Sequence, residues 1–257
     1  ILITLPFVAY IIGIEAFSQL SIAMIIFQFC FMITEWGFNI YSIESVYKKN
    51  QIENVSDLFS HIITIKLFFA CSILILLSVI YYQDIFYLNV DFLFISLLLA
   101  IFFASFNPLW FYQAIQKVEI LIIPTIIARI FFILVIYIFL DNSEKTYIYM
   151  FAQSLTFAII SMFAFFNIYK NHIILKKINI FETFKLFKST LSFFYSNIIM
   201  NQFHILWGLL LLLFANPIQI AYFNIADQGF RAGTAFNSIL PEVSLSRNLR
   251  DANFNVI

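Results

Sequence analysis

The sequence predicts an all-α fold, a polytopic bundle of transmembrane helices, and three observations support this prediction. Of the 257 residues, 63% are hydrophobic and only 11% are charged, whereas soluble domains carry about 25% charged residues. The apolar segments are continuous over the roughly 20 residues that a helix needs to cross a bilayer, without the alternation typical of membrane barrels. Cationic side chains gather in alternate connections, as they do in membrane proteins with several spans.

Apolar segments follow one another along the chain at 1–12, 18–46, 60–82, 91–114, 119–140, 146–169, 190–214 and 219–241. The first is too short for a span, so we expect half of a transmembrane helix within a fragment of a longer protein. The second becomes amphipathic after Trp36, which fits a tilted helix that leaves the membrane near Tyr47. Pro108 predicts a kink, and Pro217 is expected to begin the last helix, where its missing N–H is harmless.

Charge patterning predicts the topology. Segment 170–188 is the most basic and is assigned to the cytoplasm, because Lys and Arg resist translocation. On this basis 47–59 is cytoplasmic, and 83–90 and 141–145 are periplasmic. Aromatic residues near the span ends are expected at the membrane interfaces. Among them are Tyr81, Tyr82, Trp110, Tyr112, Tyr147 and Tyr149.

The basic segment also predicts the domain organisation. We expect an N-terminal lobe at 1–170, a cytoplasmic basic linker at 171–189 and the start of a C-terminal lobe at 190–257. A weak internal similarity supports two lobes, since AYIIGIEA at 9–16 and LLLLFANPIQIA at 210–221 each join two apolar runs through a short connection. Transporters often place their substrate between two pseudo-symmetric bundles.

Polar residues inside the apolar segments recur at helical spacing. The stripes are Asn197, Asn201, His204 and Gly208; Asn224, Asp227 or Gln228, Arg231, Thr234 and Ser238; Ser21, Gln28 and Glu35; and Thr125 and Arg129. Each stripe lies on one face of a helix. Two interpretations remain open: hydrogen bonds between packed helices, or the lining of a wet cavity.

Charged residues favour the cavity. An arginine or aspartate at mid-span costs roughly 2.5–3.5 kcal/mol on insertion scales and usually faces a cavity or a partner. Arg129 and Arg231 have such positions, although Asp227 and Arg231 can also form a pair within one helix. Lys66 can either act in the cavity or extend to the cytoplasmic surface. His204 can titrate near neutral pH, yet a lone histidine is more often a packing residue.

Several function classes lack their signatures. The sequence has no nucleophile elbow, no phosphate-binding glycine loop and no metal-ligand spacing, and Cys30 and Cys71 form no disulfide framework. The formal net charge is zero, with no polybasic arm that suggests nucleic acid. We therefore expect no enzyme activity, no cofactor and no bound metal.

Four stretches resemble the O-antigen and polysaccharide flippase family. They are LPFVAYIIGIEAFSQLSIA at 5–23, ITEWGFNIYSIESV at 33–46, NPLWFYQAIQKVE at 107–119 and AYFNIADQGFRAGTAFNSILPEVS at 221–244. Ala114 stands where the family commonly has glycine, and Asp227 departs from the usual residue. The resemblance implies about twelve helices in two lobes, as in the wider superfamily of multidrug and oligosaccharidyl-lipid exporters. It also implies translocation of undecaprenyl-diphosphate-linked O-antigen oligosaccharide across the bacterial inner membrane by alternating access.

On this resemblance, candidate residues take three roles. The diphosphate is assigned to Arg231, Arg129 and Lys66, the cavity lining to Asn197, Asn201, His204, Trp207, Asn224 and Gln28, and coupling to H+ or Na+ to Asp227 and Glu35. Expected partners are membrane lipids, a polysaccharide polymerase and a chain-length regulator. Two alternatives remain: a cation-coupled small-molecule exporter of the same fold, and a non-transporting scaffold of a glycan assembly complex.

Overall fold

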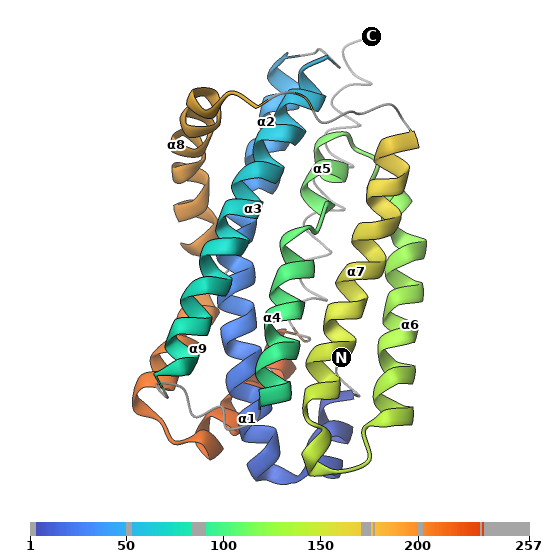
Figure 1. The fold of residues 1–257 in the computed structure, drawn as a ribbon, viewed down its shortest axis with the longest axis vertical. Helices are drawn as coiled ribbons and strands as arrows, with labels where there is room; N and C mark the ends of the chain where they lie inside the picture. Colours follow the sequence, from blue (N-terminus) through green and yellow to red (C-terminus); the bar gives the residue numbers. More distant parts are fainter. Residues whose placement is uncertain are drawn as a thin grey trace.

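A computed structural model describes residues 4–49, 53–83, 91–170, 176, 178–199, 203–231 and 233. Within these ranges every regular element is helical, and the long helices run side by side along the long axis (Figure 1). Five stretches are long and apolar enough to cross a membrane: Thr4–Val46, Val55–Tyr82, Asp91–Ala114, Val118–Phe139 and Ser143–Lys170. The predicted all-α polytopic bundle is therefore confirmed.

The helices have the following bounds. The first group is α1 (Thr4–Glu35), α2 (Phe38–Lys49), α3 (Glu53–Tyr82), α4 (Asp91–Ser105), α5 (Leu109–Ala114) and the short η1 (Val118–Leu121). The second is α6 (Ile122–Phe139), η2 (Ser143–Lys145), α7 (Tyr147–Lys170), α8 (Ile180–Asn197) and α9 (Phe203–Phe214). Residues 217–231 are also helical, so a helix begins at Pro217 as the sequence predicts.

Two glycine positions shape the first helices. α1 consists of two limbs that meet at Gly13, where φ is 77° and ψ is 164°. The limbs correspond to the predicted segments 1–12 and 18–46, although one glycine and not the whole of 13–17 makes the break. A second break separates α1 from α2 at Trp36 and Gly37, with φ values of 43° and 74°. The left-handed region is rare for a bulky residue such as tryptophan and marks a constrained turn.

Pro108 interrupts the third long span as predicted. α4 ends at Ser105 and α5 begins at Leu109, because proline supplies no N–H and its ring obstructs the preceding turn. Trp110, Phe111 and Tyr112, which follow this proline, are buried. The Tyr112 hydroxyl donates to the carbonyl of Ala164 on α7 at 2.9 Å, which fixes α5 against the bundle. Trp110 and Tyr112 therefore do not lie at an exposed interface.

α8 begins ten residues earlier than the predicted segment 190–214. The backbone N–H of Phe181 donates to the Asn179 side chain at 3.1 Å, which caps the helix. α8 packs against α2 and α3. The ring of Trp36 stacks on Phe194 with centroids 3.9 Å apart and on Phe187 at 5.1 Å. Gly37 is required here, because an added Cβ would lie 2.9 Å from the backbone of Phe193.

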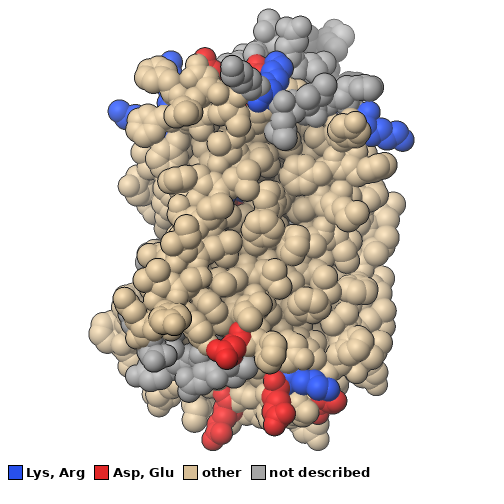
Figure 2. Space-filling view, viewed as in Figure 1, with Lys and Arg blue, Asp and Glu red and all other residues tan. Residues whose placement is uncertain are grey.

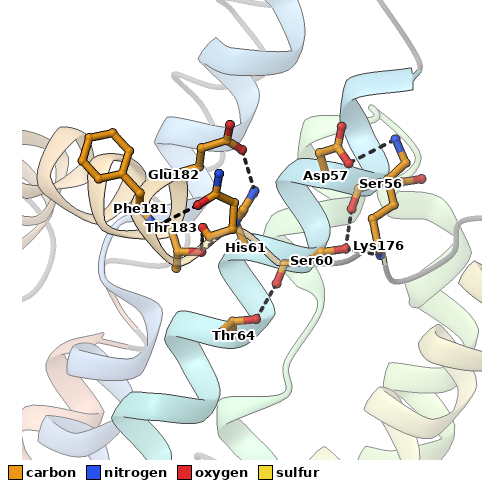
Figure 3. A network of polar contacts seen from close by, with 10 residues as sticks. Ser56, Asp57, Ser60, His61, Thr64, Lys176, Phe181, Glu182 and Thr183 are labelled. Atoms are coloured by element: carbon orange, nitrogen blue, oxygen red, sulfur yellow. Dashed lines mark hydrogen bonds and ion pairs between the residues drawn. The ribbon is translucent and has the colours of Figure 1, made fainter.

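Polar contacts also join the start of α8 and Lys176 to α3 (Figure 3). Nδ1 of His61 lies 2.7 Å from the Thr183 hydroxyl, and its Nε2 lies 3.6 Å from Glu182. Lys176 pairs with Asp57 at 3.0 Å. Its backbone N–H donates to Ser60. Residues of the predicted linker are thus attached to the first group of helices.

Charge is segregated between the two ends of the molecule (Figure 2). On the face shown, Lys and Arg side chains gather at the upper end, the lower end is mainly acidic, and a broad band without exposed charge separates them. α7 ends and α8 begins at the upper end, and the α6–α7 connection lies at the lower one (Figure 1). This is the arrangement expected when basic connections stay in the cytoplasm.

Candidate functional site

A cleft of about 370 Å³ opens between α1, α7 and the helix 217–231. α1 contributes Met24, Phe27, Gln28 and Phe31, α7 contributes Tyr149, Met150, Gln153 and Phe157, and the last helix contributes Gln228 and Arg231. The cleft thus combines apolar walls with three amide side chains, a tyrosine and a guanidinium. Such a surface suits a polar ligand that carries negative charge.

Amide groups continue from the cleft into the helix contacts behind it. Gln228 donates through Nε2 to Oδ1 of Asn224 at 3.3 Å. Asn224 is 2% exposed, and its Nδ2 lies 3.5 Å from Sδ of Met24. Of the residues assigned to a cavity, Gln28 therefore lines the cleft, whereas Asn224 lies behind its wall and holds Gln228 in place.

Arg231 and Asp227 form the pair within one helix that the sequence allows. An Nη2–Oδ2 distance of 3.0 Å joins them, and the two side chains are 32% and 11% exposed. Arg231 nevertheless lines the cleft. The carboxylate thus partly neutralises the guanidinium without removing it from the wall of the cleft.

Arg129 approaches the same region from α6. Tyr149 lies close enough to both Arg129 and Arg231 for electrostatic interaction. His204 interacts in the same way with Arg231 and Asp227. Among the described residues, Nη1 of Arg129 is buried and has no hydrogen-bond partner. A buried guanidinium N–H without an acceptor is costly, which makes this atom a ready donor for an anion.

Lys66 lies elsewhere in the bundle. Its ammonium group is 2.9 Å from Oε1 of Glu35 and donates to the carbonyl of Asn107 at 3.2 Å. The lysine is 1% exposed and the glutamate 19%. Extension of Lys66 to the membrane surface is therefore wrong, and neither residue lines the cleft with Arg231.

The remaining candidates are dispersed. Asn197 is buried on α8, and Trp207 on α9 is 54% exposed. Asn201 lies outside the described residues. Gly208, on the same stripe, packs against Ile25 of α1, where an added Cβ would lie 3.2 Å from that side chain. Part of this stripe thus serves helix packing.

Two lining residues were missed by sequence reasoning. Tyr149 was expected at an interface, yet it is 4% exposed and packs edge-on against Phe132 with centroids 5.3 Å apart. Gln153 lies one turn further along α7. The four-residue spacing of Tyr149 and Gln153 places both on one helix face and could have identified them as a polar stripe. Among the described residues, no group of three His, Cys, Asp or Glu side chains could hold a metal ion.

Comparison with known proteins gives one match. A family model described as polysaccharide biosynthesis protein matches residues 1–240. No curated protein and no solved structure matches the chain. The match covers all the helices that line the cleft and all the candidate residues named above.

Proposed function

Because this multi-pass membrane chain belongs to the polysaccharide biosynthesis protein family, we propose that it is a flippase for a lipid-linked oligosaccharide. The substrate is an undecaprenyl-diphosphate-linked oligosaccharide of the O-antigen type, and it moves from the cytoplasmic to the periplasmic leaflet of the bacterial inner membrane. The observation that carries the proposal is that Arg231 and Tyr149 line one amide-lined cleft. Arg129, whose buried Nη1 has no hydrogen-bond partner among the described residues, is a second cation within electrostatic range of the same tyrosine.

The diphosphate is the difficult part of such a substrate. An unpaired anion is very costly to remove from water, so fixed cations have to replace its hydration. Arginine suits this role because its planar guanidinium can donate to two phosphate oxygens at once. Arg231 and Arg129 would bind the diphosphate, and Gln28, Gln153 and Gln228 would bind sugar hydroxyls. Lys66 is set aside from this role, because Glu35 and the Asn107 carbonyl already occupy its ammonium group.

Asp227 has a place in the transport cycle. Its carboxylate lies 3.0 Å from Arg231, and it would release the guanidinium when the diphosphate arrives. Uptake of H+ or Na+ by the carboxylate would favour this exchange, which couples substrate movement to an ion. We assign Asp227 the coupling role and retain Glu35 as a second coupling candidate.

Alternating access requires two parts that move against each other. We divide the chain into an N-terminal lobe at 1–170, a linker at 171–189 and the start of a C-terminal lobe from 190. The cleft fits this division, because α1 and α7 belong to the first lobe and the helix 217–231 to the second. A polysaccharide polymerase and a chain-length regulator would act on the product.

The test is flipping of a fluorescent undecaprenyl-diphosphate oligosaccharide by the full-length protein in liposomes, measured with a membrane-impermeant quencher. Arg231→Ala and Arg129→Ala should each slow flipping about tenfold or more, because a hydrogen bond to a charged group contributes roughly 1.5–3 kcal/mol. Arg231→Lys should retain partial activity, since the positive charge stays but the planar guanidinium that donates to two phosphate oxygens is lost. Lys145→Ala, at the acidic end, is the control. If the Arg231→Ala variant flips the substrate at the wild-type rate, the Arg231–Asp227 pair is structural and the proposal is wrong.

A further inference from the structure

The outer face of α8 carries an unusual mixture of side chains. Phe181, Phe184, Lys185 and Lys188 recur at helical spacing and share one face. Phe181 is 76% exposed and Phe184 is 63% exposed, and both lysines are exposed. The opposite face of the helix packs on α2 and α3. Its Phe187 and Phe194 stack on Trp36, in the turn before α2, and Phe187 also contacts Phe69 of α3. We call these four residues the α8 stripe.

Among the described residues, nearby carboxylates form no ion pair with the α8 stripe, although Lys185 lines a cavity together with Asp57 and Glu182. Glu182 is directed to His61 at 3.6 Å, and Asp57 pairs with Lys176 at 3.0 Å (Figure 3). Within the described part of the chain, neither Lys185 nor Lys188 forms an ion pair. The stripe thus presents two unpaired positive charges beside two exposed aromatic rings.

An apolar crevice of about 390 Å³ lies beside the stripe, between α3 and α8. Its walls include Phe68 and Phe69 of α3, Ile178, and Ile180, Phe184 and Phe187 of α8. Phe184 belongs to both the crevice and the α8 stripe. An apolar space therefore meets a cationic surface at one side chain, in the first half of α8, which begins at the upper end of the bundle (Figure 1).

We propose that the crevice and the α8 stripe bind an anionic glycerophospholipid of the surrounding leaflet. One acyl chain fills the crevice, and the phosphate group is held by Lys185 and Lys188, whose flexible stems let the ammonium groups reach the headgroup layer. Charge complementarity selects an anionic lipid, because basic segments next to a membrane attract such headgroups. The site shares no lining residue with the arginine cleft, which distinguishes it from the site proposed for the transported lipid.

A bound lipid would act on the bundle through Phe187. This residue lines the crevice, and its ring also stacks on Trp36 at the constrained turn after α1. Occupancy of the crevice would therefore hold α8 against the first group of helices. The proposal does not depend on the transported substrate, and the two can be tested separately.

The experiment is native mass spectrometry of the purified full-length protein, titrated with phosphatidylglycerol or phosphatidylcholine. Phosphatidylglycerol should bind more tightly than phosphatidylcholine. Lys185→Gln combined with Lys188→Gln should weaken phosphatidylglycerol binding about thirtyfold, the factor expected for two lysines near an anionic headgroup. Lys145→Gln is the matched control and should bind as the wild type does. Replacement of both lysines of the stripe by arginine should restore binding and show that charge is the cause.

Three results would overturn the proposal. One is equal affinity for the two phospholipids, and another is unchanged phosphatidylglycerol binding by the double glutamine variant. The third is displacement of phosphatidylglycerol by an equimolar polyprenyl phosphate, which would make the crevice an access route for the transported lipid. Phe184→Ala tests the acyl-chain contact separately. It removes an aromatic ring from the crevice wall without changing the charge, so it should weaken the binding of both phospholipids.

Discussion

The ammonium group of Lys66 on α3 lies 2.9 Å from the carboxylate of Glu35 at the end of α1. The same group donates to the carbonyl of Asn107, which precedes the proline that ends α4. One lysine therefore joins α3 to the end of α1 and to the α4–α5 connection, and it supplies positive charge near the end of α4, where helix carbonyls lack partners. The constrained turn at Trp36 and Gly37 follows Glu35 directly.

This junction predicts a large effect from removing one partner. Glu35→Gln leaves a buried ammonium without its counter-charge and should destabilise the protein by about 3–5 kcal/mol. Adding Lys66→Met should recover much of the loss. The Asp141–Lys145 pair, at 2.7 Å but with side chains 61% and 39% exposed, is the control, and its removal should leave the melting temperature nearly unchanged because solvent screens exposed ion pairs. Thermal unfolding in detergent measures these differences, and equal effects at both pairs would contradict the prediction.

Gly37 predicts a second stability effect. Gly37→Ala places a Cβ 2.9 Å from the backbone of Phe193 at a residue with φ of 74°. We expect a loss of at least about 1 kcal/mol, because backbone strain and the clash with α8 add together. Gly229→Ala is the matched control, since nothing lies within 4 Å of its added Cβ. Alanine is also the better residue within a helix, by roughly 0.5–1 kcal/mol. The melting temperature should fall for the first variant and stay constant or rise for the second.

Asp227 predicts a change in the pH dependence of transport. If protonation of the carboxylate releases Arg231, acid conditions on the loading side should speed substrate capture by the wild type. Asp227→Asn removes the carboxylate 3.0 Å from Arg231, so its flipping rate should lose this dependence while substrate binding persists. Rates measured at several pH values in the liposome assay provide the test. A pH profile identical to that of the wild type would assign the coupling to another residue.

The charge distribution predicts the orientation. Ser143 and Ser189 are exposed, and they lie near the acidic and the basic end respectively. In a background with Cys30 and Cys71 replaced by alanine, Ser143→Cys should react with an impermeant thiol reagent in intact cells. Ser189→Cys should react only after the cells are opened. The reverse pattern would invert the topology.

Local signals in the sequence predicted much of the fold. Pro108 and Pro217 mark helix boundaries because proline lacks an N–H wherever it stands. Gly13 marks a break because glycine accepts a left-handed backbone. The start of α8 was missed, since hydrophobicity begins later than the helix does. Asn179 followed by Glu182 at the third helical position was the available N-cap signal.

The site was less predictable, because its residues come together only in the packed bundle. Helical spacing identified Gln28 and Arg231, but spacing within one helix does not show which residue of another helix they face. Tyr149 and Arg129 are brought together by the packing of α6 on α7. The partner of Lys66 is 31 residues away along the chain, and no local pattern distinguishes such a pair from a lysine that reaches the surface.

The docking of α8 on α2 and α3 has a consequence for the construction of chimaeras. By sequence α8 follows the basic segment and accompanies the second half of the chain, yet by contact it belongs to the first half. A hybrid of two relatives joined ahead of α8 would set a foreign helix against the Trp36 turn and the backbone of Gly37. A hybrid joined beyond α8 would keep that interface native. The natural crossover point therefore lies after Asn197.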